Sequence, residues 1–275
     1  MEPIIALLTD FGPRGQHYVA AIKAVILKIN PLVKIVDISH DISSYSIIEA
    51  SYILKSTYNH FPKGTVFITV VDPGVGSARE IIALKTKSNH FFIGPNNGIF
   101  PNVFDLSDLS ICINVKNKDY FNQPVSPTFH GRDIMAPIGA YITKFKNFPL
   151  SDLGPSFNFK NLLKFPIVYE LDLKNNSIKS SIQYIDSFGN GTTTIEMIGN
   201  KIKNTNLTID DGSKISIIIK QRNYKGIFSS HFSCVPVDSL LCLVGSSNFL
   251  EISINRGNAA KNLGFKVGDI ITIKI

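Results

Sequence analysis

Four short polar segments, each placed just after a predicted apolar strand, carry residue types that could do chemistry. They lie at positions 9–12 (TDFG), 37–41 (DISHD), 72–76 (DPGVG) and 94–98 (GPNNG). A single acid at a strand end is usually a helix cap or a turn former. In α/β sheets, however, ligands bind just beyond the carboxyl ends of the strands, where loops replace the hydrogen-bonded ladder. Four such loops at one edge of a sheet therefore predict a site.

Two of these segments resemble parts of well-known sequence motifs but do not match the full motifs. Asp-Phe-Gly at 10–12 precedes His-Gly-Arg-Asp at 130–133, whereas protein kinases have the reverse order, so a kinase is excluded. DPGVGS at 72–77 fits neither Gly-x-Gly-x-x-Gly nor the P-loop, which leaves phosphate or dinucleotide binding little support. The three cysteines form no Cys-x-x-Cys pair, so the sequence predicts no metal site and three buried thiols that act as apolar fillers.

The elements that must position these segments alternate along the first half of the chain. Short apolar runs predict strands at 4–9, 33–38, 65–71, 81–84 and 91–93. Apolar residues at helical spacing predict helices at 17–29, 47–58 and 134–145. This β-α-β order predicts an α/β domain over residues 1–165, with a largely parallel sheet covered by helices.

From about residue 166 onward the pattern changes to short β-rich stretches separated by clusters of Asn, Gly, Asp and Ser. The expected strands are 168–173, 180–185, 192–198, 214–220, 240–244, 250–254 and 270–275. The segment 149–164, which contains Pro149, Gly154 and Pro155, is the expected connector. Residues 166–275 are therefore predicted to form an all-β, barrel-like second domain.

Composition and charge exclude several classes of protein. Of 275 residues, 44% are hydrophobic and 18% charged, which suits a packed core and excludes a disordered chain. The apolar runs are far shorter than the roughly 20 residues that a bilayer requires, so no membrane partner is expected. The net charge is +7, but the basic residues are scattered singly, which argues against nucleic acid as a partner. The start of the sequence shows no basic leader, and we expect a cytoplasmic protein.

Taken in chain order, seven segments make the sequence resemble the S-adenosylmethionine (SAM) hydroxide adenosyltransferases, the adenosine-forming SAM hydrolases that are related to fluorinating and chlorinating SAM enzymes. The segments are TDFG (9–12), FPKGT (61–65), VDPGVG (71–76), GPNNG (94–98), FHGRD (129–133), DSFGN (186–190) and NRGNAA (255–260). Two positions depart from the family pattern. Asn96 stands where an Asp is usual, and Asn258 stands where a Ser is usual.

The resemblance implies a catalytic set of Asp72, Arg79 and His130 that handles the attacking water. The chemistry suits these residue types, because Arg79 stays protonated, His130 can accept a proton near neutrality and Asp72 can orient either partner. The halogenating relatives lack this set, so its retention favours water over a halide as the nucleophile. The sulfonium leaves as a neutral thioether, so the reaction requires an aligned nucleophile and no metal or organic cofactor.

The resemblance also implies which residues hold the substrate. Asp10 suits a ribose diol, and the ring of Tyr45 suits a sulfonium cation. In the second domain the implied ribose, adenine and methionine contacts are Asp186, Phe188, Asn190, Ser246, Ser247, Glu251, Asn258 and Ala259. Each of the main candidates has a structural alternative. The acids could cap a turn or helix, Arg79 could pair with Glu80 at the surface, His130 could be a hydrogen-bonded histidine in a loop, and Tyr45 could pack in the core. The family further implies a homotrimer with the site at a domain junction between neighbouring subunits.

Three functions follow from these observations. The favoured one is hydrolysis of SAM to adenosine and L-methionine. The second is nucleophilic halogenation of the same substrate, and the third is a protein that binds SAM or adenosine without turnover. A nucleic-acid-binding role is a distant alternative that would require binding to weaken steeply with salt.

Overall fold

The computed structural model describes residues 2–275. The chain consists of two compact units, Met1–Phe165 and Pro166–Ile275. Among the described residues, no helix is both long and apolar enough to cross a membrane.

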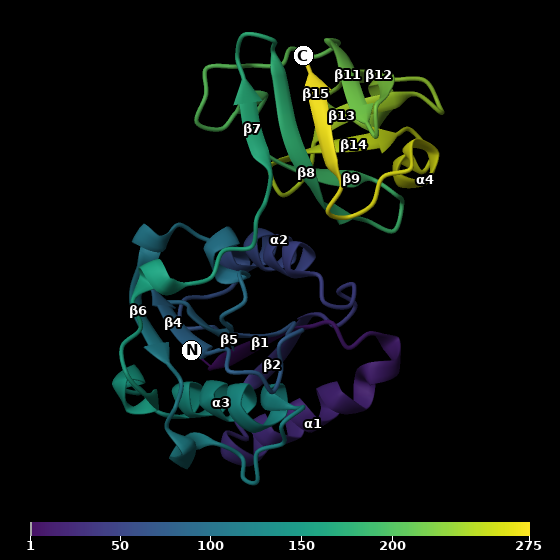
Figure 1. The fold of residues 1–275 in the computed structure, drawn as a ribbon. Helices are drawn as coiled ribbons and strands as arrows, with labels where there is room; N and C mark the ends of the chain where they lie inside the picture. The colour runs from purple at the N-terminus through teal and green to yellow at the C-terminus, as the bar shows by residue number, and fades with distance from the viewer. Residues whose placement is uncertain (1) are drawn as a thin grey trace. The chain divides into compact units, whose positions relative to one another are not determined.

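The first unit is built on a six-stranded sheet in the order β2-β1-β3-β5-β4-β6 (Figure 1). Strands β2, β1, β3 and β5 are parallel, whereas β4 runs antiparallel to both β5 and β6. The predicted, largely parallel sheet is therefore confirmed. The bounds are β1 Ile4–Thr9, β2 Lys34–Ser39, β3 Val66–Val70, β4 Ile81–Thr86, β5 Phe91–Pro95 and β6 Leu109–Asn114.

Three helices cover this sheet on its two faces (Figure 1). On one face lie α1 (Gln16–Ile29) and α3 (Ala136–Lys144), whose apolar side chains pack with alternate residues of β1 and β3. On the other face α2 (Ile47–Thr57) packs against the intervening residues of the same strands. Because successive strand residues point to opposite faces, a sheet covered on both sides needs strands that are apolar at nearly every position. Strand β3, which is buried throughout, meets this requirement.

The second unit is a closed barrel of seven strands. The strand order β9-β14-β13-β12-β11-β15-β8 closes through an additional pairing of β8 with β9, and β10 and β7 extend it beside β9 and β8. Ile182, Ile217, Ile252 and Ile273 are fully buried inside it. The barrel-like second domain is thus confirmed. The bounds are β7 Tyr169–Asp172, β8 Ser177–Ile185, β9 Gly191–Ile198, β10 Lys201–Ile202, β11 Lys214–Ile219, β12 Arg222–Phe228, β13 Leu240–Val244, β14 Phe249–Ile254, β15 Ile270–Lys274 and the short helix α4 Ala259–Leu263.

Several elements were not predicted from sequence. Strand β12 (RNYKGIF) contains four polar or charged residues and a glycine, and its side chains are mostly exposed, so it lacks an apolar run. Helix α4 spans five residues, too few for a helical period to show. The structure also corrects one expectation about the cysteines, because Cys112 and Cys242 are buried whereas Cys234 is exposed.

Short helical turns connect many of these elements. A π-helical turn, Gly131–Met135, leads directly into α3, and π-turns of this kind are frequent at functional sites. Short 3-10 turns occur at Pro13–Gly15, Tyr58–His60, Phe100–Asn102, Leu106–Asp108, Lys118–Tyr120, Leu150–Leu153, Phe159–Asn161 and Phe232–Cys234.

Candidate functional site

A cavity of about 280 Å³ lies beyond the carboxyl ends of β1 and β3 in the first unit. Asp10 follows β1 and Asp72 follows β3, as the sequence predicts for ligand-binding loops. The structure brings Asp10, Tyr45, Asp72 and His130 together in its lining, although they come from four separate segments. The remaining lining residues are Phe11, Tyr18, Ser44, Val70, Val75, Thr128, Phe129 and Gly131.

Arg79 joins Asp72 to His130. Its Nε donates to Asp72 Oδ1 at 2.8 Å, and its Nη2 donates to Asp72 Oδ2 and also to His130 Nδ1, at 3.0 Å. The Arg79 and Asp72 side chains are only 9% and 6% exposed, so this two-bond ion pair is largely shielded from water. The loop that connects Asp72 to Arg79 contains a turn in which the Ser77 hydroxyl donates to the Gly74 carbonyl at 2.7 Å. The three predicted catalytic residues thus form one connected group.

The contact with Arg79 determines which nitrogen of His130 carries the proton. A guanidinium can only donate, so His130 Nδ1 accepts, and the proton of the neutral ring is assigned to Nε2. Burial lowers the pKa of His130, and the nearby Arg79 charge lowers it further, while the carboxylates of Asp72 and Asp133 partly oppose the shift. His130 is therefore a neutral ring whose Nε2–H is a hydrogen-bond donor.

Asp133 fixes the turn that carries His130. It is fully buried and accepts from Asn122 Nδ2 at 2.8 Å and from the Ser126 backbone N–H at 2.9 Å. The Arg132 guanidinium donates to both of its oxygens, at 2.8 and 2.7 Å, and lies 5.0 Å from the centre of the Phe129 ring. One buried carboxylate therefore holds both flanks of the segment that supplies Phe129 and His130 to the cavity.

The glycine between His130 and Arg132 allows that turn to approach the sheet. A Cβ atom added to Gly131 would lie 2.7 Å from Val70 Cγ1, which is closer than Cβ atoms approach other carbon atoms in proteins. Any larger residue at this position would push the turn away from β3, because both partners are buried.

Asp10 and Tyr45 are directly connected. Asp10 Oδ2 accepts the Tyr45 backbone N–H at 2.8 Å, and Tyr45 has a left-handed backbone with φ +68°, which is unfavourable for a bulky residue. Tyr45 is 68% exposed, so core packing, the structural alternative, does not describe it. Burial raises the pKa of Asp10, and the neighbouring Asp72 charge adds to the rise, against hydrogen bonds from the Tyr45 and Asp10 backbones.

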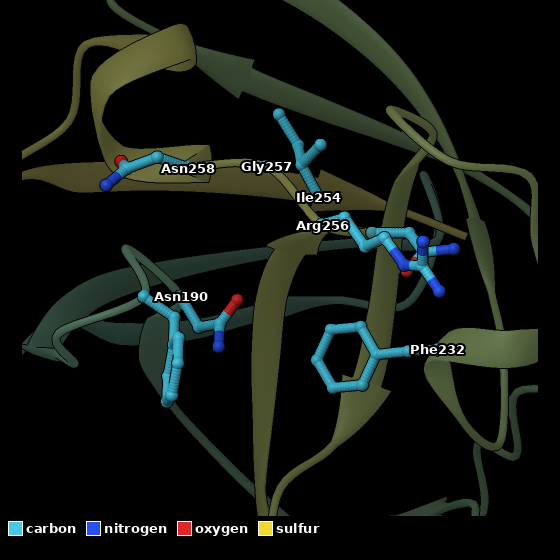
Figure 2. Close-up of a pocket in the computed structure, with 8 residues that line it drawn as sticks. Asn190, Phe232, Ile254, Arg256, Gly257 and Asn258 are labelled. Atoms are coloured by element: carbon cyan, nitrogen blue, oxygen red, sulfur yellow. The ribbon is translucent and has the colours of Figure 1, made fainter.

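A second and larger cavity, of about 670 Å³, lies in the barrel unit (Figure 2). Of the residues predicted to bind substrate there, Phe188, Asn190 and Asn258 line it. Figure 2 shows Asn190, Phe232 and Arg256 around the cavity. Sequence reasoning missed Phe232 and Arg256 as lining residues, although Arg256 stands inside the NRGNAA segment and could have been found there.

Two predicted contact residues use their side chains locally. Asp186 Oδ1 accepts the backbone N–H groups of Phe188 and Asn190, both at 2.9 Å, and Oδ2 accepts Asn190 Nδ2 at 2.8 Å. Asp186 therefore shapes the turn that presents Phe188 and Asn190, and it does not line the cavity itself. Asn258 caps α4, because its Oδ1 accepts the Lys261 N–H at 2.7 Å. Because the side chain is used for this cap, only the backbone of Asn258 is left for a ligand.

Ser246, Ser247, Glu251 and Ala259 do not line either of these cavities. Ser246 and Ser247 lie in the turn between β13 and β14, and Ala259 is buried at the start of α4. Glu251, on β14, accepts from the Thr192 hydroxyl at 3.5 Å. Burial raises the pKa of Glu251, and the charge of Asp186 raises it further. A cation beside this carboxylate would be favoured because it would offset the cost of burying the charge.

Asn96, the other departure from the family pattern, is also explained by its contacts. It is buried, its Nδ2 donates to Glu80 Oε2 at 3.2 Å, and its Oδ1 accepts the Leu163 N–H at 2.9 Å. An amide can both donate and accept at this place, which a carboxylate cannot do. Among residues 2–275, no group of three or more His, Cys, Asp and Glu side chains is placed to hold a metal ion.

Comparison with known proteins decides the family. The model of the SAM hydroxide adenosyltransferase N-terminal domain matches residues 5–154, and the model of its C-terminal domain matches residues 180–272. The chain belongs to the SAM hydroxide adenosyltransferase family. The resemblance noted from the seven segments is thereby confirmed.

Relatives within the family include proteins with two different names. The (R)-S-adenosyl-L-methionine hydrolase of Methanocaldococcus jannaschii is 33% identical over 98% of this chain and 95% of its own length. A fluorinase from an Actinoplanes species is 27% identical over 70% of this chain and 72% of its own. A crystal structure of a conserved protein from Thermotoga maritima superposes with a TM-score of 0.87, at 31% identity, covering 98% of this chain and 100% of that one.

Proposed function

We propose that this protein hydrolyses SAM to adenosine and L-methionine by attack of water at the ribose C5′. The observation that carries the proposal is the buried guanidinium of Arg79, which contacts both Asp72 and His130, two residues that line the 280 Å³ cavity. Hydrolases of this name that match nearly the full chain support it, such as the one from M. jannaschii. The substrate is expected to be the epimer with R configuration at sulfur, for which that relative is named.

The chemical step is a displacement that releases one proton. The water oxygen forms a bond to C5′, the C5′–S bond breaks, and its electron pair leaves with the neutral thioether of methionine. Asp72 accepts a hydrogen bond from the water, and His130 Nε2–H donates one to the water oxygen. Arg79 holds these two side chains at fixed positions, so the nucleophile is aligned before the reaction starts. The proton leaves the product oxygen for Asp72 or for solvent.

Further residues of each unit are proposed to hold the substrate. Asp10 accepts both hydroxyl groups of the ribose, and the exposed ring of Tyr45 faces the sulfonium cation. In the barrel unit Phe188, Asn190 and the Asn258–Ala259 backbone bind the nucleoside, with Asp186 shaping the turn. Glu251, with Ser246 and Ser247, binds the amino acid end of methionine. The reaction uses no metal or organic cofactor, and the homotrimer implied by the family stays a prediction that light scattering can check.

The decisive experiment is incubation of the purified protein with SAM in ¹⁸O-labelled water, followed by chromatography with mass detection. We expect the label in the 5′-hydroxyl of adenosine. The two sulfur epimers are supplied separately, and the R epimer is expected to be consumed faster. Unchanged SAM beside demonstrable binding would overturn hydrolysis and leave a SAM-binding protein.

Nucleophilic halogenation is the second candidate, since fluorinases are relatives of this chain. It predicts 5′-halo-5′-deoxyadenosine when chloride or fluoride is added to the same incubation. Asp72 and His130, which line the cavity and are held together by Arg79, favour water, because a carboxylate that accepts and a ring N–H that donates can both hydrogen-bond a water molecule, whereas a halide can only accept. Detection of a halogenated product would overturn this assignment.

A further inference from the structure

A third cavity, of about 550 Å³, lies in the first unit at the edge where the parallel strands begin. Pro3 precedes β1, Gly64 precedes β3, and Phe91 is the first residue of β5. Asp10 and Asp72, by contrast, follow the far ends of β1 and β3. Five residues of extended strand span about 17 Å, so this cavity and the candidate active site lie at opposite edges of the sheet.

The walls of this cavity are mainly apolar and aromatic. The lining includes the strand residues Phe91, Ile111 and Ile113, and Phe145 and Phe148, which follow α3. Its uncharged polar members are Asn89, Thr143, Asn147 and Ser151. The Phe145 side chain is 50% exposed and Ile111 is 36% exposed, so the cavity opens to solvent. Its volume falls within the usual range for sites that bind small molecules, which are mostly apolar with a few polar groups.

The charged groups in the lining are all basic. Lys85 and Lys146 line the cavity, and neither Asp nor Glu does. Lys85 is half-buried and its Nζ lies 5.2 Å from the centre of the Phe91 ring. Within residues 2–275, no ion pair is recorded for Lys85 or Lys146. The Lys85 ammonium lies beside an aromatic ring with no carboxylate in the lining, and an anion would supply its counter-charge, whereas Lys146 is exposed and adds positive charge at the opening.

We propose that this cavity is a second ligand site, which binds a small organic anion with an apolar body. The carboxylate or other anionic head contacts Lys85 and Lys146, and the apolar body packs against Phe91, Phe145 and Phe148. The site rejects SAM, because a sulfonium would meet two lysines and no acid. Because this cavity lies at the opposite edge of the sheet from the candidate active site, anion binding there does not depend on the proposed hydrolysis. Each proposal can therefore be tested without the other.

The test measures binding of 1-naphthoate to the full-length protein by isothermal titration calorimetry, with octanoate as a second anionic probe and neutral 1-naphthamide as the matched control. We expect saturable binding of the anions at one site per chain, and weaker or no binding of the amide. Saturating adenosine, a product of the proposed reaction that is not turned over, leaves the affinity unchanged. Failure of both anions to bind, equal binding of the amide, or competition by adenosine would overturn the proposal.

Variants locate the site. Lys85→Gln is expected to weaken naphthoate binding about fivefold, the size of one partly exposed ion pair, and Lys146→Gln similarly. Phe145→Ala removes part of the apolar wall and also weakens binding. Lys87→Gln is the matched control, because Lys87 is exposed, lies two residues beyond Lys85 and does not line the cavity. An unchanged affinity in Lys85→Gln, or an equal loss in Lys87→Gln, would show that the anion binds elsewhere.

Discussion

Arg79 donates to His130 Nδ1 at 3.0 Å, although the two residues are 51 positions apart in the chain. This hydrogen bond leaves Nε2–H as the donor of the neutral ring, and the proposed mechanism therefore assigns His130 to donate a hydrogen bond to the nucleophile and not to remove a proton. The distinction has consequences that can be measured, because a donor and a base tolerate different replacements.

His130→Gln places an amide N–H near the Nε2 position and is expected to retain part of the activity, about a tenth. His130→Asn can accept from Arg79 but has no group at the Nε2 position, and should lower kcat about 10²- to 10³-fold, the usual cost of losing one positioned donor. The measurement is kcat for adenosine formation in both variants. Equal inactivity of the two would point to a base, which glutamine cannot replace.

Arg79→Lys keeps the positive charge and loses the fork geometry that binds Asp72 through two bonds. We expect kcat to fall at least 100-fold while SAM still binds, since Arg79 does not line the cavity. Arg79→Ala should abolish turnover and also lower stability by about 3–5 kcal/mol, because Asp72 is left as an unpaired buried charge. Calorimetric binding and thermal unfolding separate the two effects.

The matched control for this pair of variants is Arg222→Lys, at an exposed position on β12 of the barrel unit. It should change neither activity nor stability. Full activity in Arg79→Lys would remove the two-bond geometry from the mechanism.

The pH dependence of kcat reports on His130. Burial and the Arg79 charge lower its pKa, so the ring gains a proton at a more acidic pH than an ordinary histidine, whose pKa is about 6.5. We therefore expect kcat to be flat across that region and to fall only at more acidic pH. A kcat that falls with a midpoint at or above 6.5 would contradict a neutral, Arg79-bound ring.

Substrate binding should have a different pH dependence. Burial raises the pKa values of Asp10 and Glu251, so both carboxylates gain protons at a higher pH than exposed acids do. Because the charged forms are the ones proposed to bind ribose and ammonium groups, KM should rise as the pH falls through this raised range. Glu251→Gln should raise KM near neutrality and flatten part of this dependence, with kcat much less affected.

Asp133→Asn tests how the turn before α3 positions His130. Burial alone would raise the pKa of Asp133, but hydrogen bonds from Arg132, Ser126 and Asn122 outweigh it and the pKa is lowered. A carboxylate with a lowered pKa contributes stability above its unfolded value, and this contribution is lost as the pH falls through the folded value. The variant should therefore be less stable at neutral pH, with the difference from wild type narrowing in acid.

The same variant should lower kcat about tenfold or more with a smaller change in KM, because small displacements of an aligned group are costly. Arg132→Met, which removes the partner that stacks on Phe129, should give a similar shift in kcat. The check is a comparison of kcat, KM and unfolding temperature with wild type. A variant that loses stability and keeps its kcat would mean that Asp133 has no positioning role.

Much of this molecule could be predicted from the sequence alone. The alternation of apolar runs and helical periods located β1, α1, β2, α2 and β3 within one or two residues. The loops after β1 and β3 could be assigned to one edge of the sheet, because parallel strands end on the same side. The ordered segments identified the family. These features follow from local spacing of residue types, which the backbone geometry of helices and strands converts directly into buried faces.

Only the tertiary structure decided which polar groups meet. Arg79 could have paired with its neighbour Glu80, but the loop after β3 folds back and directs it to Asp72 and His130. The Asp186 side chain accepts hydrogen bonds within its own turn, and the Asn258 side chain caps α4. The barrel closes because β8 pairs with β9, two strands at opposite ends of the seven-strand order. The periodicity of apolar residues along the chain specifies which side chains are buried. The partner of a hydrogen-bonding group depends on distance and direction in three dimensions, and the spacing of residues along the chain does not specify these.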